Sequence, residues 1–163
     1  MQQSIKTVVI REFDTETEHD DFVLDLTQTV PRDCIGCWSC WWKTPGYCVH
    51  KDLNDFYQAF LSADKAIFFL RTSMGFVSGN VKTLFDRMIP HFMPYINYKT
   101  GESMHDLRYG HYPDIEVYYD GEFACDEERQ LFEEYLARVF YQFSMSALVK
   151  PYNAYEEVRA CAH

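Results

Sequence analysis

The sequence predicts an α/β protein with a doubly wound sheet, and three observations support this class. From residue 22 onward, predicted strands alternate with predicted helices, which is typical of βαβ units. Residues 65–70 form a continuous apolar run, as in strands buried on both faces of a parallel sheet. The chain of 163 residues is 47% hydrophobic and contains no linker, so we expect a single domain over residues 1–163.

The first two predicted strands lie close together in the sequence. They cover residues 7–13, which include the β-branched run Thr7-Val8-Val9-Ile10, and residues 22–27. Only about eight residues join them, whereas a parallel crossover usually needs a dozen or more and a helix. We therefore expect these strands to be antiparallel, or the first strand to be displaced from the centre of the sheet.

Hydrophobic periodicity predicts the remaining elements. A helix begins at an Asp52 N-cap and ends near residue 62, a second begins near Ser78 and stops before Pro90, and a third covers residues 126–143 with Leu131 on its buried face. Strands are predicted at residues 114–119 and 146–150. Residues 151–163 receive no assignment.

Composition and charge exclude several kinds of partner. The formal net charge of -10 disfavours nucleic acid and anionic membranes, which both need a basic surface. Residues 1–13 lack a basic segment followed by an apolar one, and no window has the length of a membrane span. The sequence therefore favours a cytoplasmic protein with reduced thiols, acting on a small redox molecule or another protein.

The most informative segment is the cysteine loop, residues 34–48, which contains four of the six cysteines and all three tryptophans. Cys34, Cys37, Cys40 and Cys48 follow a Cys-x2-Cys-x2-Cys-x7-Cys pattern, and the turn pair Pro45-Gly46 would return the last cysteine to the others. Compact cysteine runs bind [4Fe–4S] clusters in bacterial ferredoxins. Zinc, disulfides and reduced cysteines packed without a ligand are the alternatives, which spacing does not separate.

Two other segments are candidates for a site or an interface. Residues 71–80 follow the buried strand, where open α/β sheets bind ligands. Residues 92–113 are a long irregular stretch rich in Tyr, His and Gly. Because this stretch is too apolar to lie wholly in water, we expect it to form much of a dimer interface.

Other polar residues are poorer candidates for chemistry. Asp86 and Arg87 could touch a ligand, but they lie on an amphipathic helix and are expected to form a surface or interface pair. Four histidines show no metal-ligand spacing, and we expect each to be solvated or hydrogen-bonded. These are His50, His91, His105 and His111. Cys125 and Cys161 are isolated and predicted to be ordinary reduced thiols.

Several of these motifs occur together in one known family. The cysteine loop is followed by His50-Lys51-Asp52, Ser62-Ala63-Asp64 precedes the buried strand, and a helix runs from Gly79 to Arg87. In this combination the chain resembles the flavodoxin-fold NADPH-dependent FMN reductases and iron–sulfur flavoproteins. Residues 101–105 and 108–109 are similar to an insertion in that family. The resemblance covers about residues 22–149.

This resemblance implies a flavin-dependent oxidoreductase that transfers electrons between NAD(P)H and FMN. FMN would lie at the carboxyl edge of the sheet, where Trp38 and Trp41 could stack on its ring. The ring-side loop would consist of Thr72, Ser73, Met74, Gly75, Phe76, Val77 and Ser78. By the same resemblance, Cys34, Cys37, Cys40 and Cys48 would hold a [4Fe–4S] cluster. The flavin carries the reaction, so no catalytic acid or base is expected.

The amino-terminal part departs from the family pattern. Family members have a glycine-containing phosphate loop and a helix after the first strand, whereas residues 12–21 contain no glycine and several carboxylates. These carboxylates would repel a phosphate dianion. The predicted fold is therefore flavodoxin-like with a truncated or rearranged amino-terminal unit. We expect isolated protein to bind FMN weakly, with little preference over riboflavin, unless a partner chain completes the site.

The sequence leaves a second function open. The chain could be a flavin-free family member that serves as a binding or electron-transfer subunit through its cysteine loop. Such a subunit would form a homodimer or pair with a related flavoprotein.

Overall fold

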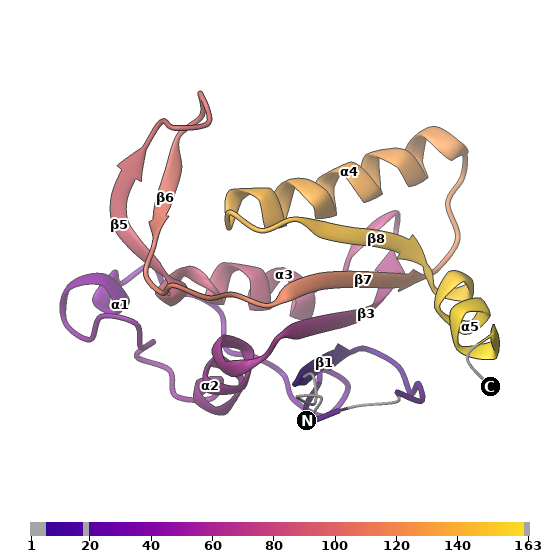
Figure 1. Ribbon diagram of the computed structural model, residues 1–163, viewed down its shortest axis with the longest axis horizontal. Coiled ribbons are helices and arrows are strands. Elements are labelled where there is room, and N and C mark those ends of the chain that lie inside the picture. Colours follow the sequence, from indigo (N-terminus) through magenta and orange to yellow (C-terminus); the bar gives the residue numbers. More distant parts are fainter. Residues whose placement is uncertain (1–5, 18–19, 162–163) are drawn as a thin grey trace, which may run out of the picture.

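The computed structural model describes residues 6–17 and 20–161. Its centre is a sheet with the spatial order β2, β1, β3, β7, β8 (Figure 1). These strands are β1 (Thr7–Arg11), β2 (Phe22–Asp25), β3 (Lys65–Ser73), β7 (Asp114–Asp120) and β8 (Ala147–Pro151). All neighbours on this path are parallel, and the short β4 (Phe76–Val77) pairs antiparallel with β3. The predicted α/β class with a parallel sheet is confirmed.

The prediction for the first two strands was wrong. β1 and β2 are adjacent and parallel, with Val8 opposite Phe22, and β1 lies inside the sheet between β2 and β3. The prediction assumed a helical crossover, but an extended chain covers about 3.3–3.6 Å per residue and can cross a short strand without a helix. Asp21 secures the return, because its carboxylate accepts a hydrogen bond from the Thr7 N–H at 2.7 Å.

Three helices lie close to their predicted positions. They are α2 (Asn54–Ser62), α3 (Gly79–Arg87) and α4 (Asp126–Gln142). Ser78 caps α3 by accepting a hydrogen bond from the Val81 N–H at 3.2 Å. The predicted cap of α2 was wrong, because Leu53 is the N-cap while the Asp52 carboxylate binds Arg87. Leu131 is 67% exposed, so its predicted burial in α4 was also wrong.

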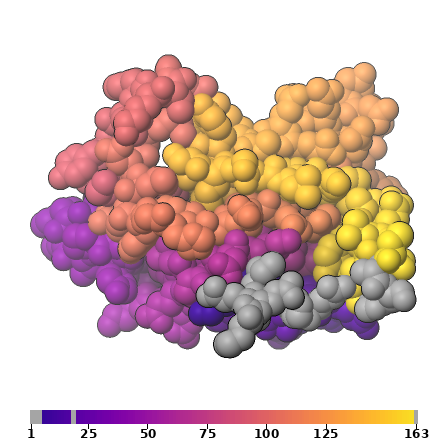
Figure 2. All heavy atoms as spheres, viewed as in Figure 1, coloured from indigo at the N-terminus to yellow at the C-terminus, as the bar shows by residue number. Residues whose placement is uncertain are grey.

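Some elements were not predicted. The cysteine loop contains a single helical turn, α1 (Ser39–Trp42), and the carboxyl-terminal segment forms α5 (Tyr152–Cys161). A 3-10 turn, η1 (Ile89–His91), directly precedes the stretch predicted to be irregular, and that stretch contains an antiparallel hairpin of β5 (Phe92–Asn97) and β6 (Met104–Leu107). Figure 1 shows this hairpin extending away from the sheet, and in Figure 2 it rises from the surface as a separate lobe.

The two faces of the sheet are covered differently. One face packs against α2, α3 and α4 through a large apolar cluster that includes Ile10, Phe68 and Val117. On the opposite face α5 is the covering helix, and the segment after β1 packs beside it. There the Phe13 ring meets the Tyr152 ring edge-on at 5.0 Å. An extended segment therefore takes the place of the helix that the family pattern has after the first strand.

Over residues 6–17 and 20–161, no helix combines the length and the apolar character needed to cross a membrane.

Candidate functional site

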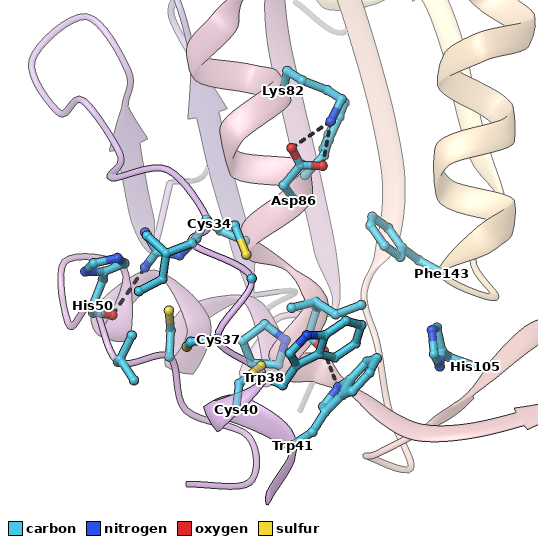
Figure 3. A pocket seen from close by; sticks show the side chains of 18 of the residues that line it. Cys34, Cys37, Trp38, Cys40, Trp41, His50, Lys82, Asp86, His105 and Phe143 are labelled. Carbon is cyan, nitrogen blue, oxygen red and sulfur yellow. Dashed lines mark hydrogen bonds and ion pairs between the residues drawn. The ribbon is translucent and has the colours of Figure 1, made fainter. Parts of the chain in front are cut away.

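The four cysteines of the cysteine loop line one cavity of about 660 Å³, which we call the cysteine cavity (Figure 3). Its walls come from the cysteine loop, the carboxyl-terminal half of α3, η1, β6 and the end of α4. Most of the lining side chains are apolar or aromatic. The polar lining side chains are His50, Lys82, Asp86, Arg87, His105, Tyr135 and Gln142. The cysteine loop, which was the most informative segment of the sequence, therefore lines a cavity in the folded protein.

A buried arginine holds the cysteine loop against α3. Arg87 is only 1% exposed, which contradicts the expected surface pair with Asp86. Its guanidinium donates hydrogen bonds to the Asp52 carboxylate at 2.8 Å, to the His50 carbonyl oxygen at 3.2 Å and to the Arg32 carbonyl oxygen. Arg32 precedes the cysteine loop and His50 follows it. One buried charge therefore fastens both ends of the loop to α3.

Asp52 completes this anchor. Its carboxylate accepts hydrogen bonds from Arg87 and from the Arg32 N–H at 2.9 Å. Burial alone would raise the pKa of Asp52, but these hydrogen bonds and the nearby guanidinium charge outweigh burial and lower the pKa. Asp52 therefore stays ionised and compensates the buried positive charge.

Two tryptophans stand beside the thiols. The rings of Trp38 and Trp41 have their centroids 4.8 Å apart, and Trp41 also contacts the His105 ring at 4.9 Å. The Trp41 indole N–H donates to the Ile89 carbonyl oxygen at 3.3 Å, which links the cysteine loop to η1. Trp38 is 60% exposed. The pair therefore offers an aromatic surface at the cavity wall for a planar or apolar ligand.

The thiols of the loop differ in environment. Cys34 and Cys37 are exposed, Cys48 is half-buried and Cys40 is buried. The hydroxyl and N–H of Ser39 donate to the Cys37 sulfur, which lowers the pKa of that thiol. Burial raises the pKa of Cys40, and the neighbouring thiols Cys48 and Cys37 raise it further. An exposed thiol with a lowered pKa thus lies three residues from a buried thiol with a raised pKa.

The predicted metal site is not assembled in this arrangement. Among residues 6–17 and 20–161, no three His, Cys, Asp or Glu side chains are placed to hold a metal ion. Figure 3 shows the sulfur atoms of Cys34, Cys37 and Cys40 pointing in different directions. The four thiols would have to move before they could hold either zinc or a [4Fe–4S] cluster. The cluster stays a prediction from the sequence.

The predicted ring-side loop lies elsewhere. It is at the amino-terminal end of α3, and none of its residues lines the cysteine cavity. The structure therefore does not bring Trp38 and Trp41 into one cavity with Thr72, Ser73, Met74, Gly75, Phe76, Val77 and Ser78. Phe76 is the link between the two regions, because its ring contacts Tyr135 of the cavity wall at 4.5 Å.

A carboxylate occupies the position expected for the phosphate loop. Glu12 directly follows β1, and its carboxylate accepts hydrogen bonds from the Arg71 N–H at 2.8 Å and from the Ser78 hydroxyl. It thus places a negative charge at the amino terminus of α3, the kind of position that binds anions in other proteins. These residues do not fit an FMN phosphate.

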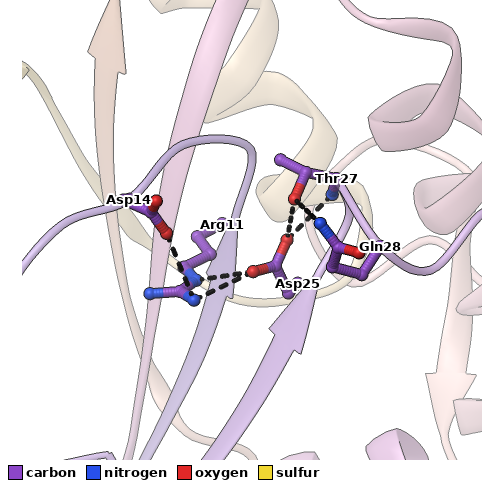
Figure 4. Close-up of polar contacts among 5 residues, drawn as sticks. All are labelled: Arg11, Asp14, Asp25, Thr27 and Gln28. Carbon is purple, nitrogen blue, oxygen red and sulfur yellow. Dashed lines mark hydrogen bonds and ion pairs between the residues drawn. The ribbon is translucent and has the colours of Figure 1, made fainter.

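The neighbouring cation at this edge is also engaged. Arg11, at the end of β1, donates to the Asp25 carboxylate at 2.9 and 3.0 Å and lies 3.4 Å from Asp14 (Figure 4). Hydrogen bonds from Thr27 and then from Arg11 lower the pKa of Asp25, although burial opposes them. The guanidinium is therefore neutralised within the protein and is not presented to a phosphate.

Two loops of the carboxyl edge are in direct contact. A Cβ added to Gly121, after β7, would lie 1.7 Å from the Thr72 hydroxyl oxygen, and one added to Gly75 would lie 2.1 Å from a Glu128 carboxylate oxygen. At Gly121 a side chain would collide with Thr72, and at Gly75 the left-handed backbone, with φ 72°, favours glycine. The segments at the carboxyl edge, where the resemblance places a flavin ring, therefore pack closely at these two glycines.

His91, in the turn η1, departs furthest from the expectation for the histidines, whereas His50 and His105 each have one buried ring nitrogen without a partner among the described residues. His91 is fully buried, and neither ring nitrogen has a hydrogen-bond partner among the described residues. Its ring stacks on Phe60 at 5.5 Å. Burial, with a smaller contribution from the Arg108 charge, lowers the pKa of His91 to about 3. His91 is therefore a neutral core residue, whereas His111 forms an expected hydrogen bond, to the Ala63 carbonyl oxygen at 2.8 Å.

No protein-family model matches this sequence, and a search of the curated proteins gave no significant match. The family resemblance therefore depends on the motifs of the chain itself.

Sequence reasoning missed the role of Arg87 and the contacts of Glu12. A basic residue at the end of an amphipathic helix gave no sign of burial, because its partners are mainly backbone carbonyl groups far away in the sequence. An available signal was Asp52, an acidic residue just outside the cysteine loop that could balance such a charge. For Glu12, the sequence indicated repulsion of phosphate but not the hydrogen bonds to α3.

Proposed function

We propose that this chain is a flavodoxin-like redox protein that acts through its cysteine loop without a tightly bound flavin. The spatial order β2, β1, β3, β7, β8 supports the fold assignment, because the main strands in chain order then read 2-1-3-4-5, as in flavodoxin-like sheets. A single observation carries the functional part. The four cysteines line one cavity beside Trp38 and Trp41, whereas Glu12 occupies the position of a phosphate loop.

The chain's own residues define what this site does. The aromatic rings and apolar walls bind a planar or apolar group, and they exclude water from the buried Cys40. Lys82 and Asp86 form an ion pair of 2.5 Å at the rim, so they contribute little net charge to the cavity. The redox-active groups that remain are the thiols. Electron transfer through them requires a partner molecule that enters the cavity or docks over it.

The β5–β6 hairpin is the partner surface that we propose. It leaves Tyr95 66% exposed, Ile96 53% exposed and Tyr98 70% exposed, which is unusual for three large side chains in one short segment. A homodimer or a heterodimer with a related flavoprotein would cover them. Light scattering should report a dimer for the protein alone or with that partner, and Ile96→Glu should reduce it to a monomer. A monomeric wild-type protein that gains no partner contradicts this part.

A flavin-dependent reductase is the second candidate. The exposed face of Trp38 favours it, because an isoalloxazine ring could stack there. In that case FMN would receive electrons from NAD(P)H, and its phosphate would need contacts from a partner chain. A [4Fe–4S] cluster on the four cysteines, if bound, would supply one-electron transfer.

An absorbance spectrum of protein purified without oxygen tests these candidates. We expect no flavin band, and in a fluorescence titration we expect FMN to bind weakly and no better than riboflavin. Each lost phosphate hydrogen bond removes about 1.5–3 kcal/mol, and every 1.4 kcal/mol is roughly a factor of ten in affinity. A bound flavin, or tight FMN binding with strong preference over riboflavin, would establish the reductase instead.

A further inference from the structure

We propose that Cys37 and Cys40 form a redox-active dithiol in which Cys37 attacks an organic disulfide in the cysteine cavity and Cys40 resolves the mixed disulfide. This inference rests on the proposed function, since it assigns the chemistry of the cysteine loop.

The first support is the placement of the two thiols at one turn of the chain. Cys37 lies just before α1 and Cys40 lies within it. Trp38 has a left-handed backbone, with φ 59°, and its carbonyl oxygen accepts a hydrogen bond from the Trp41 N–H at 2.9 Å. This hydrogen-bonded turn spans Trp38 to Trp41 and contains Cys40, and Cys37 directly precedes it. A disulfide needs a Cα separation of roughly 4.4–6.8 Å, which residues three apart in the sequence can reach, and the proposal requires the exposed Cys37 side chain to rotate toward Cys40.

The second support is the asymmetry of the pair. Cys37 is exposed and lines the cavity, and it lies two residues before Ser39, the first residue of α1. Cys40 is buried beneath this turn. The arrangement provides one nucleophile that faces incoming molecules and one protected thiol behind it, as a two-step exchange requires.

The third support is the shared cavity. Both thiols line it, together with Trp38 and Trp41. A cavity of about 660 Å³ admits a small disulfide and places it against the Cys37 sulfur. Cys34 and Cys48 also line the cavity, but no turn comparable to α1 pairs them with each other, and ten or more residues separate these two.

The reaction balances without any other reagent. The Cys37 thiolate attacks one sulfur of the disulfide, a mixed disulfide forms, and the other half leaves as a thiolate. Cys40 then loses its proton and attacks the Cys37 sulfur, which releases the second half. The Cys37–Cys40 disulfide forms, two electrons pass to the substrate disulfide, and the two thiol protons end on the two released thiols. An external thiol reverses these steps and returns Cys37 and Cys40 to the dithiol form.

Glutathione disulfide is the probe for the test. Full-length protein is incubated with it, free thiols are alkylated, and the products are located by peptide mass spectrometry. We expect wild-type protein to form a Cys37–Cys40 disulfide, Cys40→Ser to accumulate glutathione on Cys37, and Cys37→Ser to react at least about tenfold more slowly. Cys125→Ser, which removes an exposed cysteine outside the cavity, should behave as wild type. Circular dichroism verifies that each variant is folded.

A further variant tests whether the rate of attack by Cys37 can change while the fold stays intact. Ser39→Ala should slow glutathione addition to Cys37 several-fold, while the far-ultraviolet spectrum stays unchanged. The proposal is overturned if Cys40→Ser carries no glutathione on Cys37, or if the wild-type disulfide joins Cys34 to Cys48. Iron–sulfur absorbance with four unreactive cysteines also overturns it, yet leaves the cysteine-loop function standing. Tight FMN binding instead refutes the proposed function, whatever the thiols do.

Discussion

The two ends of α3 face opposite edges of the sheet and have opposite character. At the amino-terminal end, Ser78 and Glu12 are hydrogen-bonded to each other and the adjoining loops touch. At the carboxyl-terminal end, Arg87 is buried and holds the cysteine loop around an open cavity. Open α/β sheets usually bind ligands at the carboxyl ends of their strands. In this protein that edge is occupied by its own carboxylate, and the reactive side chains gather at the other end of the same helix.

The largest effect is expected from Arg87→Ala. This change leaves Asp52 without its buried partner and leaves two carbonyl groups without a donor, so the free energy of unfolding should fall by about 3–5 kcal/mol. Urea unfolding measures it. Arg138→Ala is the control, because Arg138 and Glu102 form a largely exposed ion pair, and it should cost less than about 1 kcal/mol. Equal effects of the two changes would show that the cysteine loop does not depend on its anchor.

A smaller effect is expected from His91, which lies next to the anchored end. The unfolded state binds a proton near pH 6.5, whereas the folded state does so only near its pKa of about 3. Stability is therefore complete above pH 6.5 and falls as the pH decreases toward 3. Between pH 7 and pH 5 the loss should be about 2 kcal/mol.

His91→Phe removes this proton-binding difference and keeps the ring stacked on Phe60. Urea unfolding of both proteins at pH 7 and pH 5 isolates the contribution of His91, since the other titrating groups are shared. The variant should lose about 2 kcal/mol less than wild type over this interval. An identical pH dependence of the two proteins would mean that His91 is not buried as a neutral ring.

The smallest effect concerns the closed end of α3. Glu12→Gln retains one carbonyl oxygen but loses the charge and one acceptor for the two hydrogen bonds, so the free energy of unfolding should fall by about 1 kcal/mol. Glu122→Gln, at an exposed position, should change it by less than about 0.5 kcal/mol. Stabilisation by Glu12→Gln would indicate that the carboxylate is strained there and that the site is suited to an external ligand.

Local sequence patterns predicted most elements but not how distant ones meet. Apolar periodicity located β3, α3, α4 and β7. An element that is buried on one or both faces has a regular spacing of apolar residues within its own sequence. The direction of β1 relative to β2 could not be predicted because it depends on the path of the segment that connects them. That segment is extended chain, and not the helix that usually connects parallel strands. α5 was missed because little of its surface is buried, with Tyr155 as its buried residue.

The candidate site was predicted in part for the same reason. Cysteine and tryptophan density identified the cysteine loop directly, and carboxylate density after β1 indicated that phosphate is disfavoured there. The sequence could not show that α3 separates Trp38 and Trp41 from Thr72 and its neighbours, because that follows from the orientation of a helix in three dimensions. Nor did spacing reveal that Cys40 is buried and Cys37 exposed.

The most direct test of the contrast between the two ends of α3 is a flavin titration of the 15N-labelled protein followed by NMR. We expect riboflavin and FMN to bind similarly and weakly, and to shift the Trp41 indole N–H signal and the amide signals of Cys37 and Cys40. The amides of Gly75 and Gly121 should stay in place. Shifts at Gly75 and Gly121 with an unchanged Trp41 signal, or FMN binding far tighter than riboflavin, would contradict the account and place the ligand site at the carboxyl edge of the sheet.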